Sequence, residues 1–343
     1  MKNKTSKIDA AQLNNIILRE NFSGVIHVKE INNTIFQKAN GYADRVEERE
    51  NIASTGFGIA SGCKIFTATA ICLLAEDGLL TFDTLLKDCL DIPFPYFDER
   101  ITIHHLLCHS SGMPDYFNEE IMDDYEELWK EVPMYLLTNP SAFLPLFQTG
   151  KMMFPPGEKF HYNNAGYIVL GLIVEKLTGV SLHDYVELNI FERCGMVDSG
   201  YFSMDHLPKN TDIGYIDKED GTWKTNIYSI PIKGGADGGA FVTTSDMIKF
   251  WDALIHQQLL SKFYTELLLT PHIQVEEELH YGYGVWINKF KGNIQKYYVI
   301  GFDPGVRFYS AYYPKSKRKL VISSNKNDDL RLMRNAVEKS IPL

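Results

Sequence analysis

A serine and a lysine three residues apart, Ser61 and Lys64, are the first pair whose types and spacing could do nucleophilic chemistry. They open an apolar helical pattern that ends at Gly78. A serine in the first turn of a helix lies near free backbone amides and the positive end of the helix dipole. A lysine one turn later shares its face, where the amine can take the serine proton or stabilise the alkoxide.

This spacing is weak evidence by itself, because a helix-capping serine followed by a solvated lysine has the same pattern. It also occurs at Ser316–Lys319 and Ser323–Lys326, neither of which opens an apolar helix. The surroundings of Ser61 are more specific: FGIA precedes it, FTATA begins at Phe66, and residues 101–116 read ITIHHLLCHSSGMPDY. These stretches resemble the active-site region of the serine β-lactamase-like family, particularly its branch of class C β-lactamases, esterases and D-aminopeptidases.

A second segment, Pro155–Tyr167 (PPGEKFHYNNAGY), resembles the block of this family that carries a Tyr-x-Asn motif, which falls on Tyr162 and Asn164. A phenol, with a pKa of about 10, serves as a general base only where cations stabilise the phenolate, and Lys64 would supply one. Asn164 would hold Lys64 and bind a substrate carbonyl through its amide. Tyr116-Phe117-Asn118 has the same spacing, and the surrounding block favours Tyr162.

The third catalytic segment of the family is where this sequence departs from the pattern. Relatives carry Lys-Thr-Gly or His-x-Gly on an inner strand, followed by Pro-Gly. The best match here keeps Gly301 and Pro304-Gly305 but has Val299 in the Lys or His position. Without that cation, Lys64 would be the dominant base, or the activity would be low or shifted to higher pH. The usual handle for a substrate carboxylate is also missing, and Arg307 is the residue that could replace it.

The resemblance implies an oxyanion hole made of two backbone N–H groups, one from the nucleophile and one from the inner strand. Here these would belong to Ser61 and Phe302. Backbone donors do not depend on the side chain, and Gly301 suits a strand against which a substrate lies closely. The implied reaction is attack by Ser61, proton transfer through Lys64 and Tyr162, and release of the acyl-enzyme by water. No cofactor and no metal is required.

Strand-like apolar runs lie near both ends of the chain, and the middle reads as helices. A hairpin of Gly24–Val28 and Thr34–Gln37 follows an N-terminal helix. The later strand-like runs and the last helix are Gly284–Ile287, Lys296–Ile300, Val306–Tyr313, Leu320–Ser323 and Leu330–Ser340. The helices predicted between these ends are Lys64–Asp77, Ile103–Leu107, Tyr125–Leu137, Ala165–Leu177, Leu182–Phe191 and Asp246–Ile255.

This order predicts an α+β fold in which distant segments form one sheet and a helical region is inserted. The resemblance specifies a β-lactamase/transpeptidase-like fold: an antiparallel sheet flanked by the terminal helices, plus a mainly helical domain, with the site in the cleft between them. We predict a discontinuous sheet domain of residues 1–65 and 230–343. Residues 66–229 would form the mainly helical domain.

The composition excludes some partners. The 343 residues carry a formal net charge of −10, and a diffuse negative surface disfavours nucleic acid and anionic membranes. The basic run Lys315–Lys319 is interpreted as a solvated hairpin turn. No signal-peptide pattern or membrane-spanning stretch is present, and the five cysteines follow no disulfide or zinc spacing. A reduced, cytoplasmic protein is the expectation.

Several alternatives remain at this point. Esters and small amides rank above β-lactams and D-Ala-D-Ala peptides as substrates, because the latter present a carboxylate. A catalytically weak or inactive member, acting as a ligand-binding or sensor domain, is the competing class. A metal site at His105, Cys108 and His109 is disfavoured, since no further ligand follows at suitable spacing. The glycines of Gly234–Gly239 predict a tight loop lining the pocket rather than a phosphate loop. The oligomeric state is not predicted.

Overall fold

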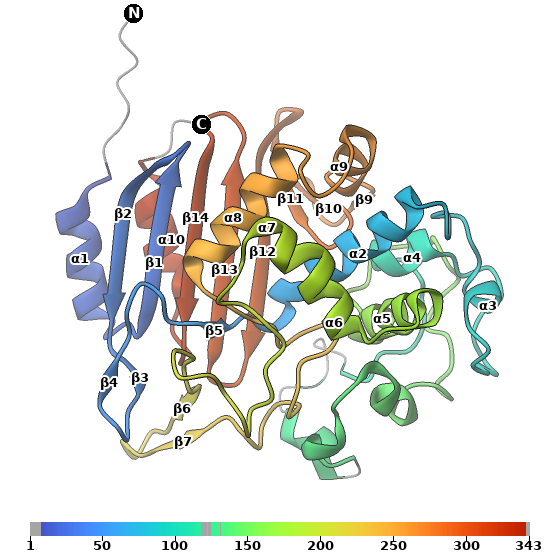
Figure 1. Ribbon diagram of the computed structural model, residues 1–343, viewed down its shortest axis with the longest axis horizontal. Coiled ribbons are helices and arrows are strands. Elements are labelled where there is room, and N and C mark those ends of the chain that lie inside the picture. The colour runs from blue at the N-terminus through green and yellow to red at the C-terminus, as the bar shows by residue number, and fades with distance from the viewer. Residues whose placement is uncertain (1–7, 118–121, 123–124, 131, 341–343) are drawn as a thin grey trace, which may run out of the picture.

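Among the described residues, one antiparallel sheet of eight strands organises the fold, and its strands come from both ends of the sequence (Figure 1). The computed structural model describes residues 8–117, 122, 125–130 and 132–340. In spatial order the strands are β2 (Asn33–Asn40), β1 (Gly24–Glu30), β14 (Arg318–Ser324), β13 (Val306–Tyr313), β12 (Asn293–Asp303), β11 (Trp286–Phe290), β10 (Leu279–Tyr281) and β9 (Ile273–Gln274). The N-terminal hairpin joins the C-terminal strands where β1 pairs with β14.

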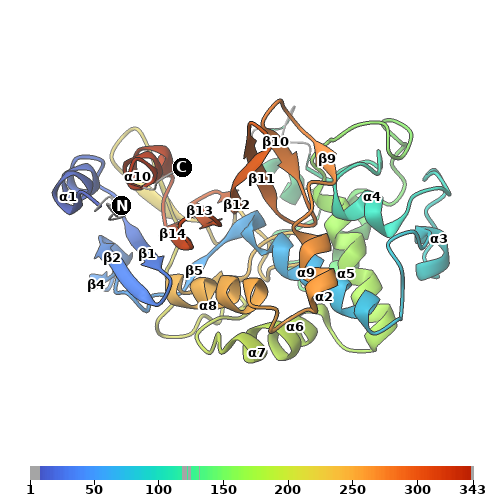
Figure 2. The same ribbon diagram turned by 90° about the horizontal axis from the view of Figure 1, so that it is seen from above.

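Helices cover both faces of this sheet (Figure 2). The terminal helices α1 (Ala10–Arg19) and α10 (Leu330–Glu338) lie together on one face, and α8 (Thr244–Ile255) lies on the other. In α10 the residues that turn toward the sheet follow helical spacing, and Met333 and Val337 are fully buried. The predicted α+β class, with an antiparallel sheet flanked by the terminal helices, is confirmed.

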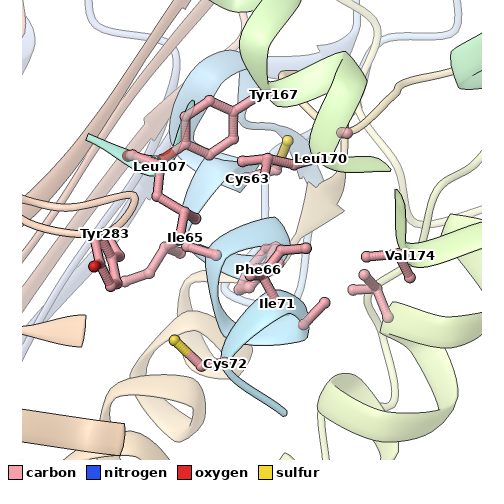
Figure 3. Packing of buried hydrophobic residues seen from close by; sticks show 14 of the residues in the cluster. Cys63, Ile65, Phe66, Ile71, Cys72, Leu107, Tyr167, Leu170, Val174 and Tyr283 are labelled. Atoms are coloured by element: carbon pink, nitrogen blue, oxygen red, sulfur yellow. Dashed lines mark hydrogen bonds between the residues drawn. The ribbon is translucent and has the colours of Figure 1, made fainter. Parts of the chain in front are cut away.

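The helical region is packed around α2 (Lys64–Glu76), which is buried along almost its whole length. A helix that is apolar on all sides belongs in the interior of a protein. Figure 3 shows Phe66 and Ile71 of α2 close to Leu170 and Val174 of α5 (Asn164–Thr178). This packing fixes the first turn of α2, which directly follows the predicted nucleophile, against the first turn of α5, which carries Asn164.

The remaining elements are short. The other α-helices are α3 (Leu86–Cys89), α4 (Ile103–Leu107), α6 (Leu182–Val186), α7 (Glu192–Cys194) and α9 (Lys262–Leu268). Four 3-10 turns are described: η1 (Ala60–Cys63), η2 (Tyr125–Lys130), η3 (Met134–Leu136) and η4 (Pro140–Leu146). The element η5 (Glu187–Phe191) is a π-helical turn. Small two-stranded pairings are made by β3 (Tyr42–Asp44), β4 (Arg49–Glu50), β5 (Phe57–Gly58), β6 (Tyr215–Asp217), β7 (Trp223–Thr225) and β8 (Phe241–Val242).

Within the described residues, no single helix is both long and apolar enough to cross a membrane. The helix α5 and the segment Leu182–Cys194 would qualify together by length and composition, but they meet at an angle of 80°.

The helix predicted at Tyr125–Leu137 is wrong. The described residues of the segment instead form two 3-10 turns, η2 and η3, with Pro133 at the start of the second. A proline has no N–H to donate and its ring clashes with the preceding turn, so it disfavours a continuous α-helix through this segment.

The basic run Lys315–Lys319 is only partly the solvated turn that its charges indicate. Lys315 and Lys317 are exposed, but Arg318 and Lys319 belong to β14 and are buried. Arg318 pairs with Glu30 at 3.0 Å and donates to the Ser340 carbonyl at 2.7 Å, while Lys319 pairs with Asp252. Charged groups enter an interior when partners there satisfy them, and those partners come from distant parts of the chain.

The sheet meets the start of α2 at one very close contact, between Gly301 of β12 and the turn η1. A Cβ atom added to Gly301 would lie 1.9 Å from the Ile59 carbonyl oxygen and 3.0 Å from the Gly62 nitrogen. Only glycine fits this position without moving backbone atoms, so the strand and the turn are held at a fixed separation.

Gly301→Ala is therefore expected to lower the free energy of unfolding by about 2–4 kcal/mol, because the new methyl group overlaps backbone rather than a flexible side chain. Urea unfolding measures this loss. Gly58→Ala is the matched control, since its added Cβ would lie 3.5 Å from the nearest atom, in Val306, which is an ordinary contact. A Gly301→Ala protein as stable as the control would show that the turn can move away from the strand.

Candidate active site

Ser61 lies in the turn η1, between the short strand β5 and the helix α2. Ala60, the residue before it, has a left-handed conformation with φ of +46°, which is unfavourable for a side chain other than glycine. Two backbone hydrogen bonds hold this turn: Gly62 N–H donates to the Ile59 carbonyl at 2.8 Å, and Gly239 N–H donates to the Ala60 carbonyl at 3.3 Å. The nucleophile is thus presented on a rigid turn that the glycine-rich loop supports.

Lys64 is one turn further on, and only 1% of it is exposed. Its Nζ donates to Ser61 Oγ at 2.9 Å, to Asn164 Oδ1 at 2.8 Å and to the Asp237 carbonyl at 2.6 Å. An ammonium group has three N–H donors, so each of them has an acceptor here. The lysine is held as a fully satisfied buried cation directly beside the predicted nucleophile.

Tyr162 lies next to this cation, with Lys64 Nζ 4.9 Å from the centroid of its ring. Its ring also stacks with Trp286, at 6.1 Å between centroids, and packs against His109 at 4.4 Å. The structure therefore brings Ser61, Lys64, Tyr162 and Asn164 together. In the alternative motif, Asn118 lies outside the described residues.

Asn164 is oriented by the carboxyl group of Asp115, a half-buried residue for which the sequence predicted no role. One carboxyl oxygen of Asp115 accepts from the Asn164 N–H at 2.9 Å and from the Asn164 side-chain amide at 3.4 Å, and the other accepts from the Ala165 N–H at 2.9 Å. Burial raises the pKa of Asp115 to about 7, against the opposing effect of these N–H donors and of Lys64. The sequence signal that could have identified Asp115 as a functional residue is its position in the ITIHHLLCHSSGMPDY segment.

The glycine-rich loop Gly234–Gly239 lines the pocket beside Ser61, as predicted. What the sequence did not reveal is that the Asp237 backbone carbonyl binds Lys64. The Asp237 side chain accepts a hydrogen bond from the Tyr116 hydroxyl, and burial raises its pKa. The direction in which a backbone carbonyl points cannot be predicted from local sequence, so the Asp237 carbonyl could be identified as a partner of Lys64 only from the fold.

The predicted inner-strand residues, Gly301 and Phe302, lie on the part of β12 that reaches beyond β11. The pairing of β11 with β12 ends at Tyr298, so in the described sheet β12 continues past it with only β13 beside it. Gly301 touches the turn that carries Ser61, and the Phe302 side chain is 55% exposed. That the Phe302 N–H completes an oxyanion hole with the Ser61 N–H stays a prediction.

Among the described residues that line the pocket, no cation takes the place of the missing third-motif residue. Val299 is 2% exposed and packs in the same core as α2. Phe308 of β13 faces the Ser61 turn, near Gly62, so its neighbour Arg307 points to the opposite face of the sheet. There the Arg307 guanidinium lies 5.3 Å from the Phe302 ring and donates to the carbonyls of Asp303 and Val306.

A pocket opens next to Ser61, and its charged lining is entirely acidic. Its walls include Phe143, Phe202, Met204, Ile230, Phe241 and Val306. Asp212, Asp237 and Asp303 also line it, and none of its described lining residues is Lys, Arg or His. Burial raises the pKa of Asp212 to about 8, opposed by the Gly58 N–H and by Arg49. Its described lining residues therefore offer carboxyl groups and neutral polar groups, but no cationic partner for a carboxylate.

The residues considered as metal ligands have other partners. His105 Nδ1 accepts from the Thr102 N–H at 3.2 Å in the cap of α4, and Cys108 contacts Ser110 and His104. His109 packs against Tyr162. Across the part of the chain that the structure describes, no three His, Cys, Asp or Glu residues gather in a way that could hold a metal ion.

Comparison with known proteins agrees with this geometry. A family model described as Beta-lactamase matches residues 20–340. Penicillin-binding protein 4* of Bacillus subtilis is 30% identical over 329 residues, which are 91% of this chain and 70% of that protein. The crystal structure of a penicillin-binding protein from Bacillus halodurans is 53% identical, with a TM-score of 0.93, covering 96% of this chain and 100% of the other. The D-amino acid amidase from Ochrobactrum anthropi SV3 shares the fold, with a TM-score of 0.78 and 21% identity over 98% of this chain and 97% of that one.

Asp212→Asn is expected to flatten the dependence of stability on pH. The Asp212 carboxyl has an ordinary pKa of 3.8 and a folded pKa of about 8, so between these values the folded protein keeps a proton that the unfolded chain has lost. The free energy of unfolding therefore falls as the pH rises from about 4 to about 8, and asparagine removes this contribution.

Urea unfolding at pH 5 and pH 8.5 measures the change. Asp91→Asn serves as the control, because that exposed carboxyl pairs with Lys176, which lowers its pKa, and it stays ionised across this range. Equal pH slopes in wild type and Asp212→Asn would contradict the raised pKa.

Proposed function

The chain belongs to the Beta-lactamase family, whose members are serine hydrolases, and from that premise we propose that it hydrolyses small esters and amides through an acyl-enzyme on Ser61. The family and the β-lactamase/transpeptidase-like fold predicted from the sequence are thereby confirmed. The proposal rests on one observation above all, the buried Lys64 ammonium that donates to Ser61 Oγ at 2.9 Å.

The arrangement of donors supports Tyr162 as the group that takes the Ser61 proton. In its ammonium form Lys64 donates to all three acceptors, and in that form it cannot accept a proton. It can stabilise negative charge on Ser61 Oγ and on the phenolate of Tyr162, whose ring lies 4.9 Å away. This differs from the expectation that the loss of the third-motif cation would make Lys64 the dominant base.

The proposed reaction then runs in two halves. Ser61 Oγ attacks the substrate carbonyl carbon while its proton passes to Tyr162, and the N–H groups of Ser61 and Phe302 hold the oxyanion. The tetrahedral intermediate collapses, the bond to the leaving group breaks, and Tyr162 returns the proton to that group. Water then attacks the acyl-enzyme with the same proton transfers and releases the acid and free Ser61.

The pocket supports a substrate without a carboxylate. Its lining contributes Asp212, Asp237 and Asp303 but no described cation, and all three donors of Lys64 are occupied. Esters and small amides with a neutral or amine-bearing acyl group therefore rank above β-lactams and D-Ala-D-Ala peptides. Relatives are named penicillin-binding proteins, so acylation by a penicillin is proposed as a slower reaction of the same serine.

Ser61→Ala is expected to abolish hydrolysis of p-nitrophenyl acetate and butyrate, lowering kcat by at least about 1,000-fold, because no other group can form the acyl-enzyme. Rates are followed from pH 6 to pH 10. Ser316→Ala, in a second Ser-x-x-Lys sequence on the turn before β14, is the matched control and should keep wild-type activity. Equal rates near background in wild type and Ser61→Ala would favour the alternative, a weak or inactive member that binds ligands.

Substrate charge provides a separate test. A unit charge about 8 Å from a carboxylate is disfavoured by about 2 kcal/mol at an effective dielectric constant near 20, or about 30-fold. We expect kcat/KM for the anionic mono-p-nitrophenyl succinate to lie at least about 10-fold below that for the neutral butyrate at low salt. The gap should widen from pH 7 to pH 9 as Asp212 ionises, and Asp212→Asn should remove this widening.

Glycine p-nitrophenyl ester, which carries an ammonium group, should not show this penalty. An anionic ester that reacts as fast as the neutral one would mean that a cation reaches the substrate, and the proposed substrate class would be wrong.

A further inference from the structure

His109 follows α4 and contacts the segment that carries Tyr162 from both sides. Its carbonyl accepts from the His161 N–H at 2.8 Å, and its side-chain Nδ1 accepts from the Asn163 N–H at 3.1 Å. These two N–H groups belong to the residues immediately before and after Tyr162. One residue therefore fixes the backbone on each side of the predicted general base.

The His109 ring also packs directly against the phenol ring. The two ring centroids are 4.4 Å apart, and the same imidazole lies 4.7 Å from the Tyr281 ring and 5.0 Å from the Tyr167 ring. His109 is 1% exposed. Its backbone is left-handed, with φ of +58°, so the ring is directed by a turn that few residue types adopt.

The hydrogen bond to Asn163 specifies the tautomer of the imidazole. A nitrogen that accepts from a backbone N–H carries no proton, so the ring must hold its proton on Nε2 and be neutral. Burial and the nearby charge of Lys64 keep the pKa of His109 well below its usual value, which agrees with this state. A protonated ring would lose its only acceptor and release Asn163.

We propose that His109 is a positioning residue for Tyr162: its neutral imidazole orients the phenol toward Lys64 and Ser61 by holding the Asn163 N–H and by packing against the Tyr162 ring. This rests on the proposed role of Tyr162 in proton transfer. It assigns a function to a histidine that the sequence pattern had suggested only as a possible metal ligand.

Two substitutions separate the acceptor from the bulk of the ring. His109→Asn places an amide oxygen near the position of Nδ1, and asparagine tolerates a left-handed backbone. His109→Phe keeps an aromatic ring but leaves the Asn163 N–H unpaired. With p-nitrophenyl butyrate, we expect His109→Phe to lower kcat by about 10–100-fold with KM changed by less than about 3-fold, and His109→Asn to retain most of kcat. Thermal melts establish that both variants are folded at the assay temperature.

A double-mutant cycle with Tyr162→Phe separates positioning from a general structural effect. If His109 acts through Tyr162, His109→Phe should cost less than about 2-fold once the hydroxyl of Tyr162 is gone. The rate of Ser61 labelling by a fluorophosphonate gives the same comparison where turnover is too slow to measure. Equal losses in both backgrounds, a His109→Phe variant within about 2-fold of wild type, or an Asn variant no better than Phe would each overturn the proposal.

These outcomes are distinct from a failure of the proposed function. Turnover that survives Ser61→Ala would remove the acyl-enzyme mechanism itself, and a Tyr162→Phe variant as active as wild type would remove the proposed role of Tyr162 in proton transfer. Loss of activity in both of those variants, combined with an unaffected His109→Phe, would leave the mechanism standing and refute only the role of His109.

Discussion

The buried ammonium of Lys64 is the interaction on which the rest of the site depends. A cation that is 1% exposed persists in a protein interior only where hydrogen-bond acceptors replace the water it has lost. Its acceptors are Ser61 Oγ, Asn164 Oδ1 and the Asp237 carbonyl, from three segments that are far apart in the sequence. Satisfying this one charge therefore fixes the turn before α2, the first turn of α5 and the glycine-rich loop relative to one another. The cation is satisfied in the interior only when these three segments are together.

The sheet adds a second constraint, which is steric. Gly301 lets β12 approach the Ser61 turn closely enough that any side chain would overlap the Ile59 carbonyl. Val299, two residues earlier on the same face, packs into the core with α2 at the position where the resemblance led us to expect a Lys or His. The strand β12 thus approaches the Ser61 turn closely at Gly301 but carries no positive charge at residue 299. With Lys64 hydrogen-bonded to its three acceptors and Arg307 on the far face, the described pocket lining contains carboxyl groups and no basic side chain.

Much of this could be predicted from the sequence, and the failures have physical reasons. Helices and strands with strong local patterns were placed to within a few residues, including α4 and β13, because burial periodicity and terminal glycines are local signals. The segment Tyr125–Leu137 failed because its periodicity was read across Pro133. Arg318 was read as solvated because its partners, Glu30 and Ser340, lie at the two ends of the chain. Partnerships between distant segments, and the direction of backbone carbonyls, have no local signature.

The same reasoning explains why two sequence blocks that were recognised separately form one physical unit. The block that ends at Tyr116 supplies His109 and Asp115, and both bind backbone N–H groups of the block that carries Tyr162. His109 holds residues 161 and 163, and Asp115 holds residues 164 and 165. Four N–H groups within five residues are thus tied to a single neighbouring segment. Tyr162 and Asn164 lie on a short stretch that precedes the regular hydrogen bonding of α5. The conformation of this stretch is set by its hydrogen bonds to His109 and Asp115. A short irregular segment has no stability of its own, so residues that act at Ser61 need this second block to hold them.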